Sequence, residues 1–146
     1  MENIEKDERN ILDELNKGAS MGQDAIHFIL EKVEDEALKK ELEKQYQDYK
    51  RISEKIHQIY PNYSEKEPHE TNIVNKALTW YGIEMKTLMD ASTSKITELL
   101  LQGTNMGIIE GRKLLNHKSP DPKVYDLIKE YVAMQEESVE NLKKFL

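Results

Sequence analysis

Residues 11–30, ILDELNKGASMGQDAIHFIL, decide the fold, because a similar stretch returns at residues 96–115, ITELLLQGTNMGIIEGRKLL. Six of the twenty aligned positions are identical without a gap: Ile11/Ile96, Leu15/Leu100, Gly18/Gly103, Met21/Met106, Gly22/Gly107 and Leu30/Leu115. Composition alone does not explain the match, because five of the six glycines in the chain lie in these two stretches. The repeat predicts two helical hairpins related by an approximate two-fold axis.

The overall composition predicts one helical domain. A chain of 146 residues suits a single domain, here residues 1–146. Charged residues make up 34% and hydrophobic residues 38%, with only four prolines and two phenylalanines, a balance typical of helical proteins. The absence of cysteine excludes disulfides, thiolate metal sites and thiol catalysis.

Charge and hydropathy indicate which environments and partners to expect. The net charge of −7 argues against nucleic acid or an anionic membrane surface as a partner. No run of about 18 apolar residues is present to span a bilayer. The polar first ten residues, MENIEKDERN, do not resemble a secretory signal. We therefore expect a cytoplasmic protein that binds neither membranes nor nucleic acids.

Apolar residues recur every three or four positions along most of the chain, which is the spacing of amphipathic helices. Pro61 ends the second helix, while Asp121 and Pro122 supply the N-cap and first residue of the last helix. One helix over residues 71–117 would be about 70 Å long at 1.5 Å per residue, so we place a break at residues 90–94, where Asp, Ser and Thr can cap helices. The expected helices are residues 3–33, 35–60, 71–89 (a crossover helix), 92–117 and 121–145.

The helical glycines need an explanation, because each costs about 1 kcal/mol relative to alanine. Gly18 and Gly22 lie one turn apart, as do Gly103, Gly107 and Gly111. We expect these glycines to mark the close crossing of the first and fourth helices. Two alternatives are a glycine-lined gap that admits a ligand and a contact in a homodimer.

Small residues and helical spacings carry a resemblance to a known family. They are Leu15-Asn-x-Gly18, Gly22, Val33-x-Asp35-x-x-Leu38-Lys39, Leu78-x-Trp80, Gly103 and Gly107. This pattern resembles small uncharacterised bacterial ferritin-like four-helix bundles of unknown function, and the likeness covers most of the chain. The resemblance implies an all-α, ferritin-like up-down bundle of two hairpins with a crossover helix, but it does not by itself imply iron.

Di-iron ferritin-like proteins carry an inward-facing Glu on each of two helices and Glu-x-x-His on each of the other two. This sequence has one Glu-x-x-His, formed by Glu54 and His57. At about 100° per residue, Glu54 falls opposite the apolar face of its helix, and His57 lies about a right angle from that face. We therefore expect no di-iron centre and no cofactor. Glu54 and His57 become metal candidates only if the helix is rotated from this assignment.

Glu110 is the one carboxylate that the spacing places on an inner face. A buried lone carboxylate requires hydrogen bonds or a proton. We expect Glu110 to be partly exposed or to be hydrogen-bonded by nearby tyrosines, and the alternative is a site at the bundle centre for iron, another divalent metal or a small molecule.

The function that follows is a non-catalytic structural or interaction protein, acting as a homodimer or with a protein partner. The alternative is a divergent metal-binding ferritin-like protein or oxidoreductase with its site around Glu110. A third reading is a bundle that binds a hydrophobic compound in an apolar cavity beside the glycines.

Overall fold

A computed structural model describes residues 2–64, 73–88, 90–116 and 121–146, with side chains from residue 8 onward except at 73–77 and 87. Within these residues all regular secondary structure is helical, which confirms the all-α prediction. The five α-helices are α1 (Glu2–Leu30), α2 (Glu36–Ile59), α3 (Ile73–Thr87), α4 (Thr93–Leu115) and α5 (Pro122–Leu142). Two short 3₁₀ turns, η1 (Tyr60–Asn62) and η2 (Lys143–Phe145), follow α2 and α5.

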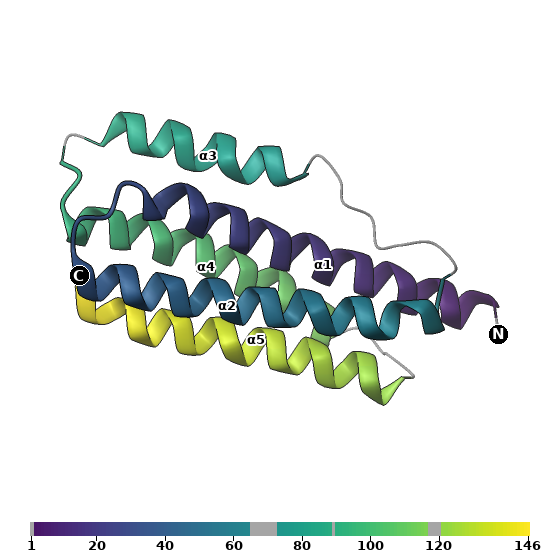
Figure 1. Ribbon diagram of the computed structural model, residues 1–146. Coiled ribbons are helices and arrows are strands. Elements are labelled where there is room, and N and C mark those ends of the chain that lie inside the picture. Colours follow the sequence, from purple (N-terminus) through teal and green to yellow (C-terminus); the bar gives the residue numbers. More distant parts are fainter. Residues whose placement is uncertain (1, 65–72, 89, 117–120) are drawn as a thin grey trace.

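The helices form two hairpins and a crossover. Helix α1 packs along α2, α4 packs along α5, and the hairpins meet mainly where α2 contacts α5. Helix α3 lies outside this group against α1, and it carries the chain back from the end of α2 to the start of α4 (Figure 1). The expected crossover is therefore present, and each copy of the repeat lies in the first helix of its hairpin.

The helix boundaries follow local capping chemistry. The side chain of Asp35 accepts a hydrogen bond from the Leu38 amide at 2.8 Å, and that of Asp121 accepts one from the Lys123 amide at 2.9 Å. The predicted break at residues 90–94 is also present, because Ser92 caps α4 and its own amide donates to Asp90 at 3.0 Å. The break lets α3 and α4 run in opposite directions (Figure 1).

Some predicted helix ends differ from the structure. Helix α1 ends at Leu30 rather than at residue 33, because Lys32 and Val33 donate tight i→i−3 hydrogen bonds to Ile29 and Leu30. Val33 is nevertheless buried, so it packs in the core from the loop. Regular α-helix also ends at Leu142 rather than at residue 145, where η2 takes over. The predicted ends at residues 71, 89 and 117 lie outside the described residues.

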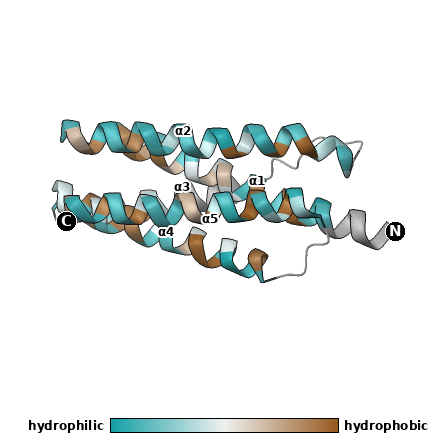
Figure 2. Ribbon diagram, turned by 90° about the horizontal axis from the view of Figure 1, so that it is seen from below, coloured by the Kyte–Doolittle hydropathy of each residue, from teal (hydrophilic) through white to brown (hydrophobic). Residues whose placement is uncertain are grey.

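The core lies between the four long helices. Its fully enclosed side chains are mostly leucine and isoleucine, including Leu12, Leu15, Ile29, Leu38, Leu42, Ile52, Ile56, Ile96, Ile128 and Leu142. Figure 2 shows the hydrophobic residues of α2 on the side turned toward the other helices. Burying one such side chain stabilises the fold by about 1.5–3 kcal/mol, so this core is the main source of stability. Toward α3 the close packing gives way to a cavity.

Candidate ligand cavity

A cavity of about 830 Å³ opens between α1 and α4. Trp80 and Tyr81 of α3 border it, and Tyr49 of α2 and Tyr131 of α5 also line it. All five glycines of the repeated stretches, Gly18, Gly22, Gly103, Gly107 and Gly111, are part of its lining. The glycine strip thus borders a space large enough for a small molecule.

The glycines accommodate side chains rather than a neighbouring helix backbone. A methyl group at Gly22 would lie 2.5–2.7 Å from three atoms of the Tyr49 ring, and one at Gly18 or Gly103 would collide with the hydroxyl of Tyr131 or Tyr81. A methyl group at Gly107 would meet the Gln135 amide, and one at Gly111 would meet Val132. The expectation of a close backbone crossing of the first and fourth helices is therefore wrong: the nearest obstacles are side chains from α2, α3 and α5.

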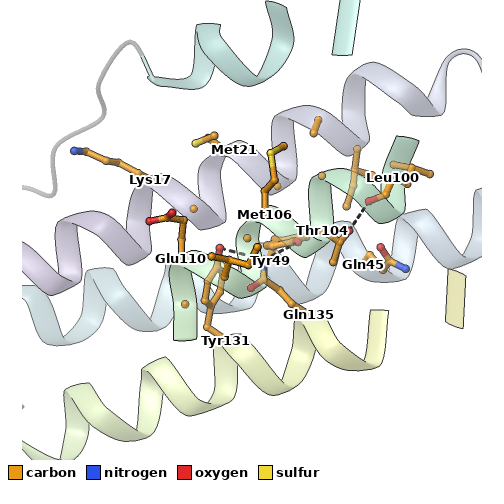
Figure 3. A pocket seen from close by; sticks show the side chains of 18 of the residues that line it. Lys17, Met21, Gln45, Tyr49, Leu100, Thr104, Met106, Glu110, Tyr131 and Gln135 are labelled. Carbon is orange, nitrogen blue, oxygen red and sulfur yellow. Dashed lines mark hydrogen bonds between the residues drawn. The ribbon is translucent and has the colours of Figure 1, made fainter. Parts of the chain in front are cut away.

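A polar cluster lines the cavity on the side of α2 and α5. The Gln135 amide nitrogen donates to the hydroxyls of Tyr49 and Tyr131, both at 3.3 Å (Figure 3). The two tyrosine rings meet edge to face, with centroids 6.3 Å apart. Gln45 lines the cavity one helical turn before Tyr49. Among the described residues, Gln135 Oε1 and Gln45 Nε2 have no hydrogen-bond partner although both atoms are buried.

The tyrosines of the cavity are neutral hydrogen-bonding groups. Burial raises the pKa of Tyr49, Tyr81 and Tyr131, because the phenolate is poorly solvated there. The neighbouring Tyr49 raises the pKa of Tyr131 further, and the charge of Glu110 adds to this effect. All three hydroxyls therefore keep their protons well above neutral pH and remain hydrogen-bond donors.

Charged groups lie at the rim of the cavity. Glu14 pairs with Lys17 on α1 at 3.0 Å, and Glu110 pairs with Lys113 on α4 at 3.3 Å. Figure 3 shows Lys17 pointing away from the tyrosine cluster, whereas Glu110 lies nearer to Tyr131, whose pKa its charge raises.

The prediction that Glu110 points into the core is wrong, because 71% of its side chain is exposed. The buried face of α4 is rotated toward Thr97, Leu100, Thr104 and Gly111, which leaves Glu110 at its edge. As an exposed carboxylate beside a lysine, Glu110 needs neither the buried tyrosines nor a metal for its satisfaction.

Glu54 and His57 lie on the exposed side of α2. His57 Nδ1 is 2.7 Å from the backbone oxygen of Ser53, one turn earlier in the same helix. Over the part of the chain that the structure describes, no group of three or more His, Cys, Asp or Glu is placed to hold a metal ion. No observation there favours the alternative of iron or another divalent metal at Glu110, Glu54 or His57.

Gln45 is a cavity residue that the sequence did not single out. It lies three residues after Leu42 and four before Tyr49, on the apolar face of α2, so a polar residue at that helical position was an available signal. Gln135 offered the same kind of signal, because it lies four residues after Tyr131 on the buried face of α5.

Comparisons of this chain with protein-family models, with curated proteins and with solved structures found no match. In the described residues, no helix is both long and apolar enough to cross a membrane.

Proposed function

We propose that this protein is a non-catalytic binding protein that holds a small, mainly apolar molecule in the cavity between α1 and α4. The observation that carries this proposal is the cavity of about 830 Å³ lined by all five repeat glycines. Its volume falls within the range of about 300–1,000 Å³ that is common for ligand sites. Leu100, Met21, Ile26 and Trp80 supply apolar surface within the lining.

This proposal takes up the third reading of the sequence, a bundle that binds a hydrophobic compound beside the glycines. The expected role as a structural or interaction protein with a protein partner stays a prediction. A ferritin-like ancestry is also part of the proposal, and its support is the order of two hairpins joined by a crossover helix. A homodimer remains a prediction. Ile83, Met106 and Ile109 are large apolar side chains, each at least half exposed, that a second subunit would cover.

Thermal unfolding in the presence of hydrophobic compounds tests the proposal. A ligand at about one hundred times its Kd stabilises the folded state by about 2.7 kcal/mol. For a chain of this size, each kcal/mol shifts Tm by about 2–4 °C, so we expect a rise of about 5–10 °C. Within a series of primary alcohols, each added methylene should contribute about 0.8 kcal/mol until the cavity is full.

A pair of alanine variants shows whether any stabilisation arises in the cavity. Ala25 is buried and lines the cavity, so Ala25→Leu places three more carbons there and should weaken or abolish the ligand-induced Tm shift. Ala133 is exposed on α5, so Ala133→Leu should leave the shift unchanged. The proposal fails if no compound raises Tm, or if both variants respond like the unaltered protein.

A further inference from the structure

We infer that the ligand of this cavity is an uncharged amphiphile whose head group both donates and accepts hydrogen bonds, and that Gln135, Tyr49 and Tyr131 bind that head group. A long-chain alcohol or primary amide belongs to this class. The inference rests on the proposed function and specifies the ligand of the same site.

The first observation is the unused hydrogen-bonding capacity of two buried amides. Gln135 is 2% exposed and Gln45 is 3% exposed, and both line the cavity. One amide atom of each, Gln135 Oε1 and Gln45 Nε2, lacks a partner in the described part of the chain. Buried polar atoms are nearly always paired in native proteins, so a ligand that completes these bonds gains affinity from them.

The second observation is that the polar cluster requires both a donor and an acceptor from its ligand. The Gln135 nitrogen donates to Tyr49 and Tyr131, which leaves both phenol protons available for an acceptor. Gln135 Oε1 needs a donor. The distribution of the terminal torsion angle of glutamine is broad, so a small rotation about this bond turns Gln135 Oε1 toward a head group. If the Gln135 amide is flipped, its oxygen accepts from the two phenols and its nitrogen needs an acceptor, while the phenol oxygens can accept from a donor. The head group must therefore still supply both a donor and an acceptor.

The third observation is the position of the charges. The charged side chains that line the cavity are Glu14, Lys17, Glu110 and Lys113. They form two ion pairs on the more exposed parts of α1 and α4, and the tyrosine cluster contains no counterion. A carboxylate head group would lose its hydration at the cluster without gaining an opposite charge. An ammonium head group would meet only Glu110, which is exposed and already paired with Lys113. An uncharged head group avoids that penalty.

Two isomeric probes test the inference on the unaltered protein. Decan-1-ol and 1-methoxynonane contain the same atoms, but only the alcohol donates a hydrogen bond. A purely apolar cavity favours the ether, because the ether is easier to remove from water. The polar cluster reverses this order, and we expect decan-1-ol to bind roughly fivefold to tenfold more tightly in calorimetric titration.

Charged probes of the same chain length test the second half of the inference. At pH 8 we expect decanoate and decylammonium each to bind at least about tenfold more weakly than decan-1-ol. Equal or tighter binding of either ion overturns the assignment of an uncharged ligand.

The variant Gln135→Met keeps the side-chain length but removes both amide atoms. We expect it to bind the ether as before and to lose the preference for the alcohol. Gln47→Met, on the exposed side of α2, is the matched control and should keep the preference. If Gln135→Met does not fold, Gln45→Met and the isomer comparison on the unaltered protein still decide the question.

The outcomes separate this inference from the proposed function. Binding of both isomers with equal affinity, or tighter binding of the ether, overturns the head-group assignment and leaves an apolar binding protein. Failure of every probe to bind overturns the proposed function itself.

Discussion

Replacing Gly22 with alanine tests how the glycines and tyrosines of this bundle depend on each other. In an ordinary helix interior the change stabilises the folded state by about 1 kcal/mol. At Gly22 the new methyl group would lie 2.5, 2.6 and 2.7 Å from three atoms of the Tyr49 ring, which is well inside normal contact distance. The ring is buried and its hydroxyl accepts a hydrogen bond from Gln135, so it moves only by disturbing the cluster.

Overpacking of this kind costs about 1–3 kcal/mol. Three close contacts to a rigid ring place Gly22 at the upper end of that range. After the gain in helix propensity is subtracted, we expect Gly22→Ala to lower the free energy of unfolding by about 1–2 kcal/mol.

Gly82 is the matched control. It lies inside α3, and a methyl group there would have no neighbour within 4 Å. Gly82→Ala should therefore raise the free energy of unfolding by about 0.5–1 kcal/mol. Urea unfolding followed by circular dichroism measures both changes, and their signs should be opposite.

A double-mutant cycle shows whether the loss of stability in Gly22→Ala comes from the contact with the Tyr49 ring. In a Tyr49→Val background, Gly22→Ala should be neutral or stabilising, because the three close ring atoms are gone. The reasoning is refuted if Gly22→Ala stabilises the protein as much as Gly82→Ala does. It is also refuted if the cost of Gly22→Ala is the same with and without the Tyr49 ring.

Three further predictions concern the cavity and its rim. Burial raises the pKa of Tyr49, Tyr81 and Tyr131, so the unfolded state loses its phenol protons first as the pH rises. The contribution of these tyrosines to stability should therefore be constant below pH 9 and fall above about pH 10, and their absorbance at 295 nm should rise only as the chain unfolds. Glu110→Gln should change the free energy of unfolding by less than about 0.5 kcal/mol, and a loss of 2 kcal/mol or more in urea unfolding would restore a core role for this residue. Elemental mass spectrometry of the untagged protein should find no stoichiometric iron, manganese or zinc, and a full equivalent with a chelator-sensitive Tm would favour the metal-binding alternative.

Local signals in the sequence located the five helices and the break between α3 and α4, although not every helix end. Ser92 and Asp121 have side chains that accept the first free amides of a helix, so their positions could be read without knowledge of the packing. The apolar face of α2 was equally clear, because leucine and isoleucine repeat there at helical spacing and become buried.

Glu110 shows why the same reasoning failed on α4. The inner position expected for Glu110 lies seven residues after Gly103, almost two full turns later and on the same side of the helix. Gly103 is only half-buried, however, and it lines the cavity. Glycine has no side chain whose hydropathy could show which way it faces, so a face defined by glycines has an uncertain centre. Thr97 and Thr104 mark the true direction of the buried face of α4. Both are buried, and their hydroxyls donate hydrogen bonds to backbone oxygens of the same helix.

A glycine-lined cavity was one alternative that the sequence offered. Periodicity could not decide in its favour, because the cavity depends on contacts between distant parts of the chain. Gly18 is matched by Tyr131, Gly22 by Tyr49 and Gly103 by Tyr81. In each pair the tyrosine occupies the space that a methyl group at the glycine would need. Alanine at the glycine position therefore does not stabilise the protein while the ring remains. The five repeat glycines together forgo about 5 kcal/mol of helix propensity, which is comparable with the whole stability of many domains. Three of these glycines make room for a tyrosine, and Gly107 and Gly111 make room for Gln135 and Val132. In homologues of this chain, a larger residue at position 22 should therefore accompany loss of the aromatic ring at position 49, whereas position 82 should vary independently of every tyrosine.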